Sequence, residues 1–167
     1  GTADLVKDIA KDDVRIRCIR RINRRGLTSA SMEGLLASSA TCVAVMDADL
    51  QHDESLLKEM YELIISGEFD IVIGSRYMEG GSTGKGLSSF RLFVSQAATL
   101  MGRLIIKTKV TDPMSGYFML RRVTFEHQMY KLSGKGFKVL LDLLSSTQNI
   151  RIKELPYTMR QRQTGDS

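Results

Sequence analysis

Two aspartates, Asp47 and Asp49, end the apolar run 42–46. Such a run that stops at acids is typical of a strand buried on both faces that ends at a polar cleft. Alternate residues of a strand project to one side, so the carboxylates converge if the extended geometry continues through Asp49. Mg²⁺ or Mn²⁺ prefers such oxygen ligands and adds water and phosphate oxygens. The pattern predicts a metal that holds a diphosphate, although an isolated Asp-x-Asp more often caps a helix or ends a strand.

The elements that must position these acids alternate between helix and strand. The pattern predicts a helix capped by Thr2, a half-buried strand over 14–19, a helix with small residues at Ala30, Gly34 and Ala37, a helix from Asp53 to a stop at Gly67, and a buried strand over 69–75. Such alternation indicates an α/β sheet that binds ligands beyond the carboxyl ends of its strands. If the sheet is parallel, Arg76 reaches the same edge as the two acids.

The composition fits one domain over residues 1–167. With 43% hydrophobic and 26% charged residues, the chain can bury one core, and charges interrupt every long apolar stretch. Cys18 and Cys42 lie in apolar runs, so we expect buried thiols and neither a disulfide nor a metal pair. The net charge of +5 favours an anionic partner, which could be nucleic acid, nucleotide or a lipid surface.

Three further segments carry charge or unusual composition. The arginine-rich stretch 15–25 is either a solvated surface or, at Arg24 and Arg25, a phosphate or lipid contact. The glycine-rich segment 79–86 is expected to be a mobile loop that closes over substrate. The hydrophobic helix expected over 88–106 either packs in the core or lies in the plane of a membrane.

Three ordered motifs carry a resemblance to a known family. VMDADLQH at 45–52, IGSRY at 73–77 and TDPMSGYF at 111–118 together resemble family 2 glycosyltransferases, most of all the dolichyl-phosphate mannose synthase branch and its bacterial polyprenyl-phosphate relatives. The resemblance implies a GT-A (Rossmann-like) fold, with a mostly parallel sheet and flanking helices. Residues 1–4 resemble the segment that comes after the first, nucleoside-binding strand of the family. We therefore expect an N-terminally truncated domain that is inactive alone.

The resemblance also implies a reaction and its residues. A sugar of the mannose or glucose type passes with inversion from a nucleotide-sugar donor to a polyprenyl or dolichyl phosphate acceptor, assisted by Mg²⁺ or Mn²⁺. By motif position, the metal ligands are Asp47, Asp49 and Gln51, the catalytic residues Asp49 and Arg76, the donor-phosphate residues Asp47, Asp49, Arg76 and Arg162, and the acceptor-phosphate residues Arg91 and Ser95. His52 is at most a neighbour of the metal ligands, and Asp142 is structural or on the acceptor side.

Partners and location are implied by the same resemblance. We expect a peripheral protein on the cytoplasmic face of a membrane, and self-association through the sheet edge that the missing strand leaves open. One alternative is a family 2 enzyme with a soluble sugar or polysaccharide acceptor. Another is a basic nucleic-acid module, which is disfavoured because the stretch 15–25 lacks aromatic residues and any zinc or RNP-type signature.

Overall fold

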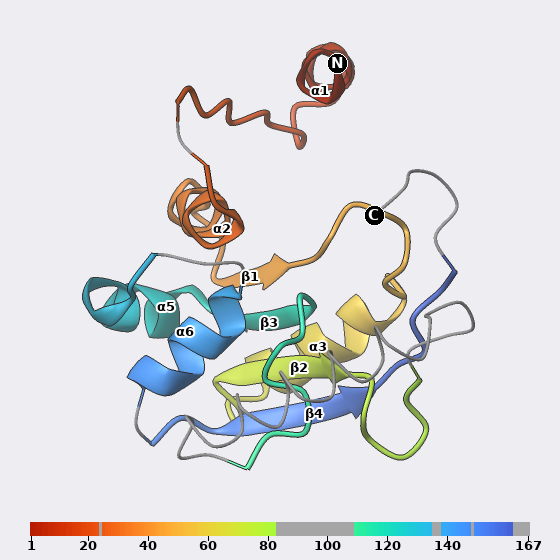
Figure 1. Cartoon of the computed structure of the whole chain (residues 1–167), viewed down its shortest axis with the longest axis vertical. Coiled ribbons are helices and arrows are strands. Elements are labelled where there is room, and N and C mark those ends of the chain that lie inside the picture. The colour runs from red at the N-terminus through yellow and green to blue at the C-terminus, as the bar shows by residue number, and fades with distance from the viewer. Residues whose placement is uncertain (24, 83–108, 135–137, 148, 162–167) are drawn as a thin grey trace.

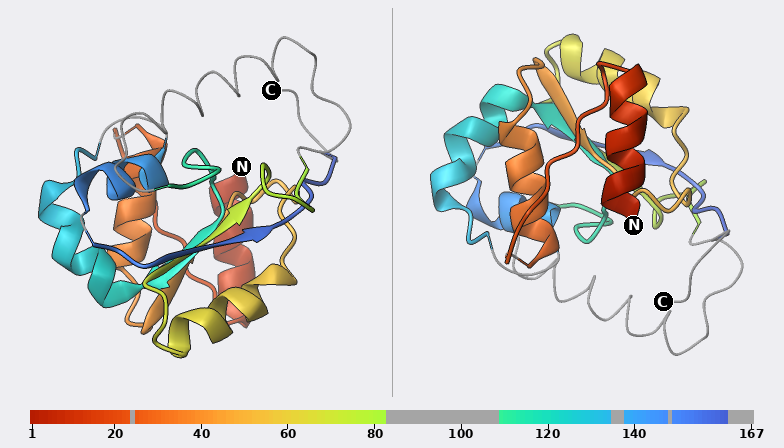
Figure 2. Two further views of the ribbon diagram at one scale, coloured as in Figure 1. Left: turned by 90° about the horizontal axis from the view of Figure 1, so that it is seen from below. Right: turned by 90° about the horizontal axis from the view of Figure 1, so that it is seen from above.

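The computed structural model describes residues 1–23, 25–82, 109–134, 138–147 and 149–161 (Figure 1). Helices cover both faces of one sheet, with α3 on one face and α2, α5 and α6 on the other (Figure 2). The elements are α1 (Thr2–Asp12), α2 (Leu27–Leu36), β1 (Cys42–Val45), α3 (Leu56–Ile65), β2 (Ile71–Ser75), β3 (Phe118–Arg121), α5 (Arg122–Gln128), the 3₁₀ helix η1 (Met129–Lys131), α6 (Val139–Ser146) and β4 (Ile152–Pro156). None of the described helices is long and apolar enough to cross a membrane.

The four-stranded sheet is mixed, in the order β1-β3-β2-β4. β3 runs antiparallel to both β1 and β2, whereas β2 and β4 are parallel. β1, β2 and β4 therefore run in the same direction, as expected of a parallel sheet, but β3 runs in the opposite direction between β1 and β2. In register, Phe118 at the start of β3 lies opposite Val45 and Ile73. The carboxyl ends of β1 and β2 thus meet the start of β3 at one edge. The predicted position of Arg76 at the same edge as the two acids depends on this arrangement.

The core has one cluster on each face of the sheet. Leu35 of α2, Phe125 of α5 and Leu140 of α6 are almost fully buried on one face. On the other face, Met60 and Ile64 of α3 have no exposed surface. β2 is buried throughout, as its continuous apolar run predicts.

Several local predictions are confirmed. The helices expected around Ala30 and after Asp53 form α2 and α3, and Gly67 follows α3 with φ +87. The first helix forms too, but Gly1 takes the N-cap position given to Thr2. Both cysteines are free thiols, although each is only partly buried.

The strand predicted over 14–19 is wrong. This segment begins with a turn at 14–15 and continues as coil, with Val14 91% and Ile19 50% exposed. Figure 1 shows it well separated from the sheet. An alternating pattern yields a stable strand only when a neighbour supplies hydrogen bonds and an apolar surface, and none of the described strands lies beside this segment.

The prediction that β1 is buried on both faces is also wrong. Within the described residues β1 pairs only with β3, and Ala44 in its middle is exposed. The Arg122 amide donates to the Thr41 carbonyl at 2.9 Å. Because hydrogen-bonded pairs alternate along an antiparallel ladder, the backbone N–H and C=O groups of Cys42 and Ala44 point away from β3. We call the side of β1 that faces away from β3 the open edge. A groove of about 380 Å³ lies between α2 and this open edge.

Candidate active site

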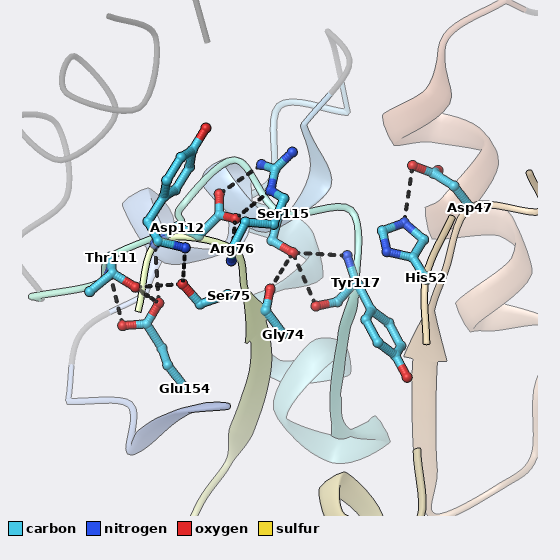
Figure 3. A network of polar contacts seen from close by, with 11 residues as sticks. Asp47, His52, Gly74, Ser75, Arg76, Thr111, Asp112, Ser115, Tyr117 and Glu154 are labelled. Carbon is cyan, nitrogen blue, oxygen red and sulfur yellow. Dashed lines mark hydrogen bonds and ion pairs between the residues drawn. The ribbon is translucent and has the colours of Figure 1, made fainter. Parts of the chain in front are cut away.

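The loops at the edge where β1 and β2 end bring together three segments far apart in the sequence. Residues 46–52 follow β1, Arg76 follows β2, and the loop 111–117 leads into β3 between them. Figure 3 shows Asp47 beside His52, and Arg76 beside Asp112. The strand order therefore places an acid and an arginine on opposite sides of the loop that leads into β3.

Asp47 lies against a buried histidine. Its side chain is 48% exposed, whereas His52 is 3% exposed, and His52 Nε2 lies 3.5 Å from Asp47 Oδ2. His52 is the largest cause of a lowered pKa at Asp47, and the positive charges of Lys138 and Arg76 add to it against the effect of burial. Asp47 is therefore an anion at neutral pH, as a metal ligand must be.

Asp49 and Gln51 lie in a bent loop. β1 ends at Val45, the chain bends over 48–50, and Leu50 has φ 62. The extended geometry that was expected to align Asp49 with Asp47 therefore does not persist. Asp49 Oδ1 instead accepts from the Gln51 amide at 3.1 Å.

Gln51 is hydrogen bonded to the segment after β4. Its Nε2 donates to the Arg160 carbonyl at 3.1 Å, and the Arg160 amide donates to the Gln51 carbonyl at 2.8 Å. Since the side-chain nitrogen is engaged, Oε1 is the atom of Gln51 that remains for a cation.

Arg76 is held by a buried carboxylate. Its Nε and Nη2 donate to the two Asp112 oxygens at 2.7 and 2.9 Å, and Asp112 has no exposed surface. Burial alone would lower the pKa of Arg76, but the hydrogen bonds and charge of Asp112 outweigh it and raise that pKa, so the guanidinium stays charged. The fork geometry fixes its plane while Nη1 makes no hydrogen bond to another described residue.

A carboxylate from β4 fixes the position of Asp112. Glu154 accepts from the amide and hydroxyl of Thr111 at 2.8 and 2.7 Å and from the Asp112 amide at 3.1 Å. The Thr111 hydroxyl also lies 2.6 Å from Ser75 Oγ. Figure 3 shows the chain of contacts from Glu154 through Thr111 to Ser75, with Asp112 beside it on Arg76.

The turn before β3 is equally constrained. Ser115 Oγ donates to the Gly74 carbonyl at 2.7 Å and accepts from the Tyr117 amide at 3.1 Å. A Cβ on Gly116 would lie 2.8 Å from Asp47 Oδ2, so a side chain here would force the carboxylate to shift. The loop 111–117 therefore contacts both sides of the site.

The family comparison agrees with these motifs. A family model described as Glycosyl transferase family 2 matches residues 1–128 of the chain. The chain belongs to this family. The resemblance read from the motifs at 45–52, 73–77 and 111–118 is thereby confirmed.

Curated relatives of this family 2 chain are longer than it is. Dolichol-phosphate mannosyltransferase of Pyrococcus furiosus is 35% identical, over 91% of the chain and 43% of the relative. The Mycosarcoma maydis protein of the same name is 32% identical, over 100% of the chain and 56% of the relative. Undecaprenyl-phosphate mannosyltransferase of Micrococcus luteus is 29% identical, over 100% of the chain and 70% of the relative. The chain spans about half the length of the first two relatives.

Solved structures confirm the fold. Glucosyl-3-phosphoglycerate synthase of Mycobacterium tuberculosis aligns with a TM-score of 0.59 and 19% identity, covering 87% of the chain and 50% of that protein. A second structure of that protein, with a TM-score of 0.55 and 19% identity, contains Mn²⁺ and UDP-glucose. At this identity the likeness supports the GT-A fold alone.

Some of the predicted residues lie outside the described part of this family 2 chain. These are Arg91, Ser95 and Arg162, together with the helix expected over 88–106 and residues 83–86 of the glycine-rich segment 79–86. Asp142 is described, and its carboxylate accepts from Ser133 and Gly134, which supports its structural interpretation. His127 is exposed on α5, as expected.

Sequence reasoning missed three charged residues of the site. Asp112 lies in a quoted motif, but no role was assigned to it, and Glu154 is a single acid in a short strand. Lys138, the N-cap of α6, has a lowered pKa, first because of burial and then because of the charge of Arg76, while Asp47 and Asp112 oppose the shift. Only the fold reveals that this lysine lies near the site.

The carboxylates present suit a divalent cation. The described residues form no group of three or more His, Cys, Asp or Glu side chains able to hold a metal. Mg²⁺ does not need such a group, because one or two carboxylates and substrate phosphates complete its shell. Asp47 is half exposed, and no hydrogen bond to a described residue occupies Oδ2 of Asp49. The donors therefore fit an ion whose shell a diphosphate completes.

Proposed function

We propose that this chain is the sugar-transferring part of a polyprenyl-phosphate glycosyltransferase. It takes a mannose- or glucose-type sugar from a nucleotide-sugar and passes it, with inversion, to a polyprenyl or dolichyl phosphate. The names of the Pyrococcus, Mycosarcoma and Micrococcus relatives support this acceptor class and favour mannose. The observation that carries the proposal is the ionised Asp47 across one sheet edge from the anchored Arg76.

The chemistry concerns the leaving diphosphate. An acceptor phosphate oxygen forms a bond to the anomeric carbon as the bond to the diphosphate oxygen breaks, and that electron pair leaves with the diphosphate. One displacement inverts the carbon. A lipid phosphate is ionised near neutral pH, since the second pKa of a phosphate ester is about 6, so it needs no general base.

The residues of the chain stabilise the developing charge. Asp47, Asp49 and Gln51 would hold Mg²⁺ or Mn²⁺, which supplies positive charge to the diphosphate oxygens. Arg76 offers to the same oxygens its Nη1, which makes no hydrogen bond to any described residue. Because Asp112 and Glu154 fix the guanidinium beforehand, little reorganisation is needed as charge develops. Arg162 is the further donor-phosphate residue that we propose.

The acceptor side is proposed from the motif alone. Arg91 and Ser95 are assigned to the acceptor phosphate, on the helix expected over 88–106, at the cytoplasmic face of a membrane. We expect the chain to bind vesicles that contain anionic lipids and to release them as salt increases, because its net charge is +5. Equal binding to neutral vesicles, or none at low salt, would contradict this location.

Self-association through the open edge is a further part of the proposal. The outward backbone groups of Cys42 and Ala44 and the exposure of Ala44 support it, because an unpaired edge is a template for another strand.

The direct test is transfer by a polypeptide that contains this chain. Labelled GDP-mannose and UDP-glucose are incubated with polyprenyl phosphate and Mn²⁺, and the label is counted in the organic and aqueous phases. We expect label in the lipid fraction, and its loss in an Asp47→Asn, Asp49→Asn variant. Label only in a water-soluble product would favour the soluble-acceptor alternative. Transfer that persists in the double variant would contradict the assigned role of the acids.

A further inference from the structure

His52 is an imidazole placed where an apolar side chain would be expected. Its ring packs against the rings of both Tyr117 and Tyr157, with centroids at 5.0 and 5.5 Å, and it is 3% exposed. Neither ring nitrogen completes a hydrogen bond with another described residue. Burying polar atoms without partners is unfavourable, so the position of this ring calls for an explanation beyond packing.

The polar contact that this ring does make is with the carboxylate of Asp47. The 3.5 Å between Nε2 and Oδ2 is an ion-pair distance and too long for a full hydrogen bond. Figure 3 shows the imidazole directed at Asp47 from below the carboxylate. A small movement of Asp47 would complete the bond, so His52 is arranged to hold one carboxylate oxygen.

Gly116 lies close to the same carboxylate. A Cβ at this residue would lie 2.8 Å from Asp47 Oδ2, so any side chain here would displace that oxygen. The turn itself is fixed, because Ser115 Oγ donates to the Gly74 carbonyl and accepts from the Tyr117 amide. Oδ2 of Asp47 therefore lies close to both the Gly116 turn and the buried imidazole.

We infer that His52 is a positioning residue that orients the Asp47 carboxylate for a divalent cation, and that Gly116 leaves room for the same carboxylate oxygen. This inference rests on the metal role of Asp47 in the proposed function. A proton on Nε2 is donated to Oδ2, which leaves the other carboxylate oxygen to the cation. Partners that orient metal ligands in this way typically change metal affinity by about 10- to 100-fold.

The experiment measures Mn²⁺ affinity by water-proton relaxation in the wild type, in Asp47→Asn and in four further variants. His52→Leu keeps an apolar side chain in the aromatic pocket and removes the donor, so we expect about tenfold weaker binding. His52→Gln can supply an amide N–H near Nε2 and should recover most of the affinity. Gly116→Ala should also weaken Mn²⁺ binding, because the added Cβ displaces the Asp47 carboxylate. The control is His127→Gln at the exposed histidine, which should bind as the wild type does.

A second readout needs no metal. The chain contains two histidines, so nitrogen-15 NMR of the imidazoles can distinguish His52 from His127 directly. We expect Nε2 of His52 to carry a proton in the metal-free protein, and the signal to respond to Asp47→Asn. An unprotonated Nε2 would overturn the inference even if a variant failed to fold.

The outcomes separate this inference from the proposed function. Binding that depends on Asp47 but is unchanged in both His52 variants overturns the positioning role and leaves the metal site intact. Binding that is equal in wild type and Asp47→Asn overturns both.

Discussion

Replacing Asp112 by Asn tests the anchoring of Arg76. The carboxylate is fully buried and accepts two hydrogen bonds from a guanidinium whose side chain is 15% exposed. Removing one partner of a buried ion pair costs about 3–5 kcal/mol, because the other charge is left without compensation. Asn keeps the volume and one acceptor oxygen but turns an N–H₂ group toward a donor. We therefore expect a loss near the lower limit, about 3 kcal/mol.

The assay is urea unfolding followed by circular dichroism, with thermal melting in parallel. For a chain of this size, a loss of about 3 kcal/mol lowers Tm by roughly 6–12 °C. The control is Glu126→Gln, which removes a half-exposed pair with Arg122 and should change stability by less than about 1 kcal/mol. An Arg76→Met, Asp112→Asn double variant should lose less stability than Asp112→Asn alone. A loss within 1 kcal/mol for Asp112→Asn, or a double variant that is less stable than the single one, would refute the reasoning.

Three further predictions concern the metal, the open edge and pH. Mn²⁺ should bind weakly to the wild type and not to the Asp47→Asn, Asp49→Asn variant, as calorimetry would measure; equal binding would remove the metal site. Ala44→Pro deletes an outward N–H and should suppress self-association in sedimentation velocity, whereas Ala44→Val should not; a wild type that is monomeric throughout a concentration series would contradict the proposal. A hydrogen bond from Arg151 lowers the pKa of Asp70 below its usual 3.8, so its stabilising effect is complete above about pH 5 and is lost as pH falls through the folded-state pKa. The stability difference between wild type and Asp70→Asn should therefore shrink on acidification, and a difference that grows would show the opposite sign.

The sequence predicted well where one apolar pattern had one structural outcome. The long helical face of α3 and the continuous run of β2 leave few alternatives, and both formed as expected. The motif at 45–52 likewise placed Asp47 at the end of a strand. These patterns predict well because a sheet face or a helix that covers it provides the apolar surface they need, whatever the order of the strands.

The failures concern residues whose structure depends on distant partners. Val14 belongs to an alternating pattern, yet no described strand lies beside it to form a ladder. The sequence assigned Arg76 to the donor phosphates but did not indicate that Asp112, 36 positions later, takes two of its donor groups. No local pattern indicates that Glu154 holds this loop, since its partners are set by the order of the strands.

The antiparallel strand β3 sets the width of the site. Adjacent strands lie about 4.8 Å apart, so two strands separated by a third lie about 10 Å apart. If β1 and β2 were neighbours, Asp47 and Arg76 could pair with each other, and Asp47 would then be less available to a cation. With β3 between them, Arg76 is balanced by Asp112 instead, and the acid and the arginine are held apart by a spacer of fixed size. A ligand that contacts both residues must therefore reach across the strand between them, which favours an elongated group with several anionic oxygens over a single small anion.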